Sequence, residues 1–124
     1  MPSFTEENYL KAVYKLSELQ PGSEVSTNSV AEELLTRPAS VTDMLRRLGE
    51  KGLVNYTRYR GVTLTEAGRR VALTTVRKHR LWEVFLVKHF GFHWDEVHEV
   101  AEQMEHVDSE LLVRRLDEFL GFPQ

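Results

Sequence analysis

Residues 27–64, TNSVAEELLTRPASVTDMLRRLGEKGLVNYTRYRGVTL, decide the fold of this chain. Their first part has the apolar spacing of two amphipathic helices, at about 27–35 with Thr27 as the N-cap, and at about 38–51. Only the break Thr36-Arg37-Pro38 separates them. Proline is tolerated in a first helical turn, because the N–H that it lacks would be unpaired there. The pattern therefore predicts two helices joined by a short turn.

After these two predicted helices, the spacing of the apolar residues changes from the helical period to the alternation of a strand. Residues 53–59 are typical of a strand, Arg60-Gly61 of a tight turn, and residues 62–64 of a returning strand. A short helix–turn–helix unit followed by a β-hairpin is the order of a winged helix-turn-helix, in which the second helix of the unit is the recognition helix.

Helical patterns extend on both sides of this stretch. We expect helices at 5–19 (capped by Thr5), 65–90, 95–106 and 108–120. The predicted fold is mainly α with a small β-hairpin. A winged helix-turn-helix DNA-binding domain is expected at residues 1–72, and a helical dimerisation and metal-binding domain at residues 73–124.

Composition limits the class of protein. Hydrophobic residues make up 41% and charged residues 28% of the 124 residues, which suits a folded globular chain. No apolar run approaches the roughly 20 residues that a transmembrane helix needs. The first residues lack the basic start and apolar stretch of a signal peptide, and cysteine is absent. We therefore expect a cytoplasmic protein that does not contact the membrane.

The net charge of −3 conceals an uneven distribution along the chain. Residues 25–80 hold 11 Lys and Arg against 5 Asp and Glu, whereas residues 81–124 hold 3 against 10. A basic middle suits a phosphate backbone, and an acidic end attracts divalent cations.

Exposed polar side chains of the predicted recognition helix and hairpin have the chemistry of a DNA interface. Arginine suits guanine or phosphate, while Ser and Thr suit several base edges; Asp43 is expected either to accept from a cytosine amino group or to position an arginine. The basic, aromatic hairpin tip suits a phosphate or the minor groove. The predicted DNA-binding residues are Arg37, Ser40, Thr42, Asp43, Arg46, Arg47, Arg58, Tyr59 and Arg60. Winged domains also serve protein contacts, which is the alternative.

Histidines and acids at helical spacing predict a metal site. Offsets of 4, 7 and 8 residues place His98, Glu102, Glu105 and His106 near one helical face, and His79 with Glu83 repeats the spacing of four. An acidic helix face alone would need no histidine. Carboxylates and imidazoles without sulfur suit manganese, iron(II), cobalt or zinc, with a preference for manganese.

These features favour a metal-responsive regulator, and we predict that the chain is not an enzyme. It has no HExxH motif and no nucleophile elbow. Two alternatives stay open: a winged-helix regulator that responds to a non-metal ligand, and a small metal-binding enzyme or metal buffer.

Three segments, residues 5–10, 77–83 and 102–106, resemble the diphtheria toxin repressor family of metal-dependent regulators. The resemblance runs from about Phe4 to Gly121. It implies a homodimer that binds a palindromic operator in double-stranded DNA and represses metal-uptake genes when metal is plentiful. Many relatives continue into an SH3-like domain, so we expect either a short member or a piece of a longer one.

The resemblance also implies two ligand sets. Glu102, Glu105 and His106, with Asn8, match the main regulatory site, and His79, Glu83 and His98 match an ancillary site. Glu102 stands where the iron branch tends to have sulfur, which favours Mn²⁺ over Fe²⁺, with Co²⁺ or Zn²⁺ as substitutes in vitro. Two positions depart from the manganese branch: Asn8 stands in place of Asp, and Lys11 replaces an acid of the binuclear site.

The implied mechanism is that metal links the first helix, through Asn8, to the regulatory ligands and so fixes the two recognition helices of the dimer. Apolar residues near the end of the chain are expected to supply the dimer surface, or, for about half of them, to close the core of a monomer. They are Val107, Leu111, Leu112, Leu116, Phe119 and Leu120.

Overall fold

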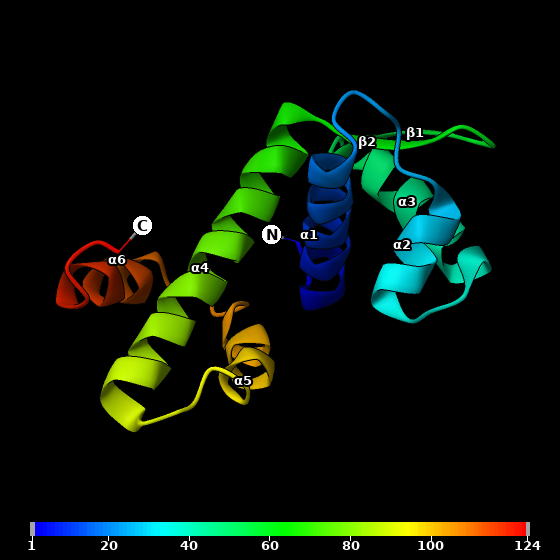
Figure 1. Ribbon diagram of the computed structural model, residues 1–124. Coiled ribbons are helices and arrows are strands. Elements are labelled where there is room, and N and C mark those ends of the chain that lie inside the picture. Colours follow the sequence, from blue (N-terminus) through cyan, green and yellow to red (C-terminus); the bar gives the residue numbers. More distant parts are fainter. Residues whose placement is uncertain (1, 124) are drawn as a thin grey trace. The chain divides into compact units, whose positions relative to one another are not determined.

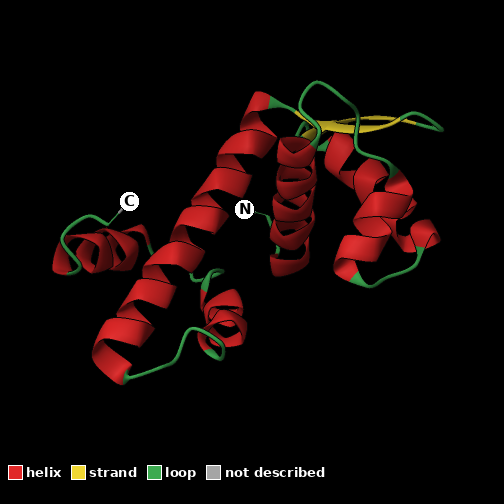
Figure 2. Cartoon of the chain, viewed as in Figure 1, coloured by secondary structure: helices red, strands yellow, loops and turns green. Residues whose placement is uncertain are grey.

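The computed structural model describes residues 2–123, and helices account for most of them (Figures 1 and 2). The elements are α1 (Phe4–Leu19), α2 (Thr27–Leu34), α3 (Pro38–Glu50), β1 (Val54–Thr57), β2 (Gly61–Leu64), α4 (Glu66–Phe90), α5 (Val97–Met104) and α6 (Glu110–Phe119). The predicted fold class, mainly α with one small β-hairpin, is confirmed. The chain divides into two compact units, the first ending at Leu73 and the second beginning at Thr74, so α4 contributes to both.

The first unit contains the helix-turn-helix and the hairpin. One apolar cluster unites α1, α2, α3, both strands and the start of α4. Leu10, Val30, Leu45, Leu48 and Val62 are among its fully buried members. Burying such side chains contributes roughly 1.5–3 kcal/mol each, so this cluster is what fixes α3 and the hairpin on one scaffold.

The helix caps differ from two of the sequence predictions. Ser3, not Thr5, caps α1: its hydroxyl accepts from the Glu6 backbone N–H, and the Glu6 carboxylate accepts from the Ser3 backbone N–H at 2.8 Å. This reciprocal capping box satisfies two donors that the first turn leaves unpaired. Ser26, not Thr27, caps α2: its hydroxyl accepts from the Ser29 backbone N–H.

The hairpin is shorter than the sequence pattern predicts. Val54 pairs with Leu64 and Thr57 with Gly61, so the tip consists of Arg58, Tyr59 and Arg60. Tyr59 has a φ of 68°, a left-handed conformation that ends the strand before it. The predicted strand at 53–59 was therefore too long, and Arg58 and Tyr59 belong to the turn.

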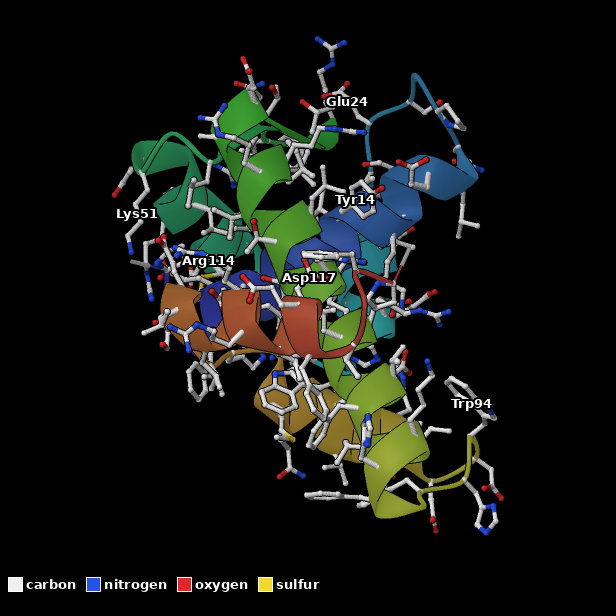
Figure 3. All side chains as sticks on the ribbon, turned by 90° about the vertical axis from the view of Figure 1, so that its left-hand side faces the viewer. Tyr14, Glu24, Lys51, Trp94, Arg114 and Asp117 are labelled. Carbon is white, nitrogen blue, oxygen red and sulfur yellow. The ribbon has the colours of Figure 1, made fainter. Side chains whose placement is uncertain are left out.

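The second unit is built around a smaller apolar cluster. Leu81, Trp82, Ala101 and Leu116 are buried at its centre. Arg77 donates to the Asp117 carboxylate at 2.8 Å, which joins α4 to α6. Trp94, the other tryptophan, lies exposed in the loop that follows α4 (Figure 3).

The helix predicted at 95–106 is shorter in the structure. It begins at Val97, after a turn over residues 94–96, and ends at Met104. Glu105 caps its C-terminus, and its backbone N–H donates to the Ala101 carbonyl. Glu105 and His106 thus lie just beyond the last helical residue, which changes how the predicted ligands are arranged.

Within residues 2–123, no helix is long and apolar enough to cross a membrane.

Candidate metal centre and nucleic-acid interface

The second unit brings His79 and Glu83 of α4 together with His98 of α5. Each offers one ligand atom, and these atoms lie within 4.8 Å of one another. Glu83 Oε2 is 3.1 Å from His79 Nε2 and 3.7 Å from His98 Nδ1. One carboxylate and two imidazoles form a nitrogen–oxygen donor set that suits manganese, iron, cobalt or zinc. The residues present therefore fit a divalent transition metal.

Two further carboxylates approach the same histidines from their other nitrogens. His79 Nδ1 lies 3.0 Å from Glu105 Oε2, and His98 Nε2 lies 2.7 Å from Glu102 Oε1. The two contacts differ in solvent access: the side chains of His79 and Glu105 are 10% and 1% exposed, whereas those of His98 and Glu102 are 56% and 51% exposed. Each histidine is thus held between two carboxylates.

Glu105 and His106 form a buried pair after α5. His106 Nε2 lies 3.7 Å from Glu105 Oε1, the oxygen that does not face His79. Burying a carboxylate or an imidazole costs free energy unless the group has polar partners. Two adjacent buried side chains of this kind are therefore unusual outside a hydrogen-bond network or a binding site.

The four side chains predicted for one helical face, those of His98, Glu102, Glu105 and His106, do not all lie on one helix. Because α5 ends at Met104, His98 and Glu102 form an exposed pair on the helix, while Glu105 and His106 lie in the buried segment that follows. Asn8 is exposed on α1, in the first unit, and Lys11 is half-buried one turn later.

In the first unit, α3 carries most of the predicted DNA-contacting side chains on an exposed face. Arg37, the N-cap residue of α3, is exposed, as are Ser40, Asp43, Arg46 and Arg47. Asp43 Oδ1 lies 3.6 Å from Arg46 Nη1, a weak contact between two exposed groups. Thr42 is half-buried, and its hydroxyl donates to the Pro38 carbonyl at 3.1 Å. Of these side chains, Thr42 is thus the least available for a base edge.

The hairpin tip presents a cationic and aromatic surface. The Tyr59 side chain is 91% exposed, and the Arg58 guanidinium lies over its ring, 4.9 Å from the centroid. Arg60 Nε is 3.5 Å from a carboxylate oxygen of Glu24, a residue of the loop before α2 (Figure 3). Both arginines are exposed and can reach an anionic partner.

Comparison with known proteins finds a matching domain for each half of the chain. Residues 3–62 match the N-terminal DNA-binding domain of iron-dependent repressors, and residues 65–124 match the metal-binding and dimerisation domain of the same repressors. The chain belongs to the iron-dependent repressor family. This is the diphtheria toxin repressor family that its sequence motifs resemble, so the predicted family is confirmed.

Relatives within the iron-dependent repressor family carry both iron and manganese names. The iron-dependent repressor IdeR of Mycobacterium tuberculosis is 39% identical over 96% of this chain and 51% of its own length. The regulator MntR of Geobacillus kaustophilus is 32% identical over all of this chain and 86% of its own. A solved manganese-dependent transcriptional repressor in complex with manganese superposes with a TM-score of 0.85 and is 43% identical, over 96% of this chain and 54% of that one. The chain spans about half the length of IdeR.

Two features of this repressor-family chain differ from the sequence predictions or go beyond them. The contacts of Glu102 and Glu105 with the outer nitrogens of His98 and His79 were not predicted, although the spacing of four between His98 and Glu102 was visible. The helix predicted at 27–35 was expected to turn Leu35 inward, which is wrong: α2 ends at Leu34, and Leu35 is 92% exposed with a φ of 54°. No sequence pattern marks a leucine for the left-handed region.

Proposed function

We propose that this protein is a metal-dependent transcriptional repressor, which binds operator DNA when loaded with Mn²⁺, or with Fe²⁺, and controls metal-uptake genes in the cytoplasm. The observation that carries the proposal is the clustering of His79, Glu83 and His98, with ligand atoms within 4.8 Å, in a chain whose first unit is a winged helix-turn-helix. The membership in a family of repressors supports the same function and argues against an enzyme.

The proposed ligands form two sets. Asn8, Glu102, Glu105 and His106 are proposed for the regulatory site, and His79, Glu83 and His98 for the ancillary site. The bound ion would supply positive charge and fix the orientation of its ligands. Manganese is favoured because all of these donors are oxygen or nitrogen, and because Glu102 offers a hard carboxylate oxygen rather than a sulfur.

DNA binding is assigned to residues 1–72. The side chains at the start of α3 are proposed to contact base edges, while Arg46 and Arg47 contact the backbone and the hairpin tip contacts a phosphate or the minor groove. The proposal is supported by the exposure of all three arginines named for α3 and of the three tip residues. Phosphate contacts by these cations would make the affinity fall steeply with salt.

The active form is proposed to be a homodimer, assembled through residues 73–124. Leu116 is buried and Leu120 packs against the same cluster, so these two close the core of one chain. Leu111, Leu112 and Phe119 are instead exposed, at 53%, 42% and 63%. An apolar helix face of this kind is typical of a surface that another copy covers.

Capture of fragmented genomic DNA on the immobilised protein tests the function directly. We expect a few upstream regions to be enriched in the presence of Mn²⁺ and lost with chelator. Equal enrichment in both conditions would keep the DNA-binding function and contradict metal control. Loss of enrichment in both would contradict the repressor and favour a metal-binding enzyme or buffer.

The variant His106→Ala sharpens this experiment. It removes a proposed regulatory ligand from the second unit and leaves every DNA-contacting side chain in place. Metal-dependent enrichment should weaken, while salt-sensitive binding to non-specific DNA and the helical circular dichroism should stay unchanged. Unaltered metal dependence in this variant would contradict the regulatory assignment.

A further inference from the structure

Glu24 lies in a short segment whose backbone is fixed on the chain's first unit. Its neighbour Val25 is buried and forms a β-bridge with Val62 of β2, in which each backbone N–H donates to the other residue's carbonyl at 2.9 Å. The next residue, Ser26, is the N-cap of α2. The backbone that carries Glu24 is therefore attached to both the hairpin and the helix-turn-helix.

Gly61 allows this segment to approach the hairpin tip. It follows Arg60 directly and has a φ of 129°. A Cβ at this position would lie 2.5 Å from the Val25 carbonyl oxygen and 3.2 Å from the Cβ of Glu24. A side chain would not fit in so little space, so glycine is what permits Glu24 to pass beside the tip.

The Glu24 carboxylate contacts the last residue of the tip. Its Oε1 lies 3.5 Å from Arg60 Nε, and the two side chains are 34% and 73% exposed. The Arg60 backbone is fixed as well, because its N–H donates to the Thr57 carbonyl at 3.0 Å. A guanidinium carries five N–H donors, so one carboxylate facing Nε leaves donors for a second anion.

We propose that Glu24 is a positioning residue of the DNA interface, which holds the Arg60 guanidinium in place for a backbone phosphate. The proposal rests on the proposed function, since it uses the assignment of the hairpin tip to DNA. It adds to that interface a carboxylate that its charge alone would exclude.

Positioning and charge have opposite effects on DNA affinity. An exposed arginine loses side-chain freedom when it binds a phosphate, and this loss weakens binding. A guanidinium that Glu24 already holds has lost part of that freedom before DNA binds. The negative charge of Glu24, in contrast, repels phosphate. Because the signs differ, removing the charge of Glu24 distinguishes the two effects.

Fluorescence anisotropy tests the proposal with the full chain, Mn²⁺ and a labelled duplex of mixed sequence at several salt concentrations. Glu24→Gln removes the charge and keeps the size of the side chain. We expect the affinity to fall by roughly 2- to 5-fold, the range that an exposed ion pair supports. The slope of log affinity against log salt should decrease by up to about 1, as for a lost phosphate contact. A rise in affinity would show that Glu24 only repels DNA and would overturn the proposal.

A double-mutant cycle shows whether Glu24 acts through Arg60. In an Arg60→Gln background, Glu24→Gln should no longer lower the affinity. Glu32→Gln is the matched control, because it removes the same charge from an exposed position on α2. It should lower neither the affinity nor the slope. Equal losses from Glu24→Gln in both backgrounds, or from Glu24→Gln and Glu32→Gln, would contradict the positioning role.

Failure of this proposal and failure of the proposed function give different results. A wild-type chain that shows no salt-sensitive binding to the duplex would overturn both. If the wild type binds and Arg60→Gln or Glu24→Gln leaves the salt slope unchanged, the positioning role alone is wrong.

Nitrogen NMR of the chain without DNA examines the contact directly. The proton on Arg60 Nε should exchange slowly with water in the wild type and faster in Glu24→Gln, while the helical circular dichroism of the two stays the same. Equally fast exchange in both chains would show that Glu24 does not hold the guanidinium, and the proposal would then be wrong.

Discussion

Lys51 and Glu6 form an ion pair in which Nζ lies 2.6 Å from Oε2, and it joins the C-terminal cap of α3 to the first turn of α1. The Glu6 side chain is only 4% exposed, and its other oxygen accepts from the Ser3 backbone N–H. The Lys51 ammonium, together with the Ser3 donors, holds the pKa of Glu6 below its ordinary value, although burial opposes the shift. Figure 3 labels Lys51.

Lys51→Met should destabilise the first unit by about 1–3 kcal/mol, because it leaves a buried carboxylate without its charged partner. Urea unfolding at neutral pH measures the change. Lys15→Met is the control: its ammonium lies 3.4 Å from Glu33 and both side chains are largely exposed, so a loss below about 0.5 kcal/mol is expected. Equal losses of stability from the two variants would contradict the prediction that the buried Glu6 carboxylate depends on Lys51.

The lowered pKa of Glu6 also predicts a dependence of stability on pH. Because its pKa is lower in the folded chain, its contribution is fully present above its ordinary pKa of 4.5 and disappears as pH falls through the folded value. Wild type should therefore be more stable than Glu6→Gln at neutral pH, and the two should converge in acid. Unfolding midpoints at a series of pH values check this, and a gap that persists unchanged into acid would contradict it.

Two helical glycines should respond to alanine with opposite signs. A Cβ at Gly68 would lie 1.9 Å from the Leu53 carbonyl oxygen, whereas at Gly49 the nearest atom is 3.9 Å away. Gly68→Ala forces the backbone apart and should destabilise by more than about 2 kcal/mol. Gly49→Ala gains helix propensity and should stabilise by about 0.5–1 kcal/mol. Thermal unfolding compares them, and stabilisation by Gly68→Ala would contradict the close approach.

The hairpin tip predicts a change in salt dependence. If Arg58 contacts a phosphate, Arg58→Ala should reduce the slope of log affinity against log salt by about 1, uniformly across DNA sequences. Fluorescence anisotropy with labelled duplexes at several salt concentrations measures the slope. Lys88→Ala removes one exposed charge from the second unit and should leave the slope unchanged. A similar effect of both variants would indicate net charge rather than a contact.

The exposed face of α6 predicts an oligomeric change. Leu112→Asp places a charge on a side chain that is 42% exposed in one chain, so it should dissociate the proposed dimer while each chain stays folded. Leu116→Asp instead buries the charge inside the chain and should unfold the second unit. Sedimentation velocity with circular dichroism separates the outcomes, and a dimer unaffected by Leu112→Asp would place the interface elsewhere.

The sequence was sufficient to predict the order of the elements, because their periods differ and glycine or proline separates several of them. The cap of α1 was also within reach, since Ser3 and Glu6 have the spacing of a capping box, while Thr5 lacks a matching acid three residues later. The turn at Tyr59 could not be predicted, because nothing in the sequence marks a tyrosine for a positive φ.

The metal-binding residues were found by spacing, but their connections were not. The contact between His79 and Glu105 depends on where α5 ends and on two side-chain rotamers, over a separation of 26 residues. Helical periodicity describes one helix at a time, so it grouped His98 with Glu105 and His106 and could not show that Glu105 turns toward α4.

The placement of the aromatic residues gives the molecule a built-in optical label. Both tryptophans, buried Trp82 and exposed Trp94, lie in the second unit, while all four tyrosines lie in the first. Excitation at the red edge of tryptophan absorption consequently observes only the half that carries the histidines. Tryptophan fluorescence can therefore follow metal uptake and unfolding of that half in the unmodified chain. The DNA-binding half contributes no tryptophan signal.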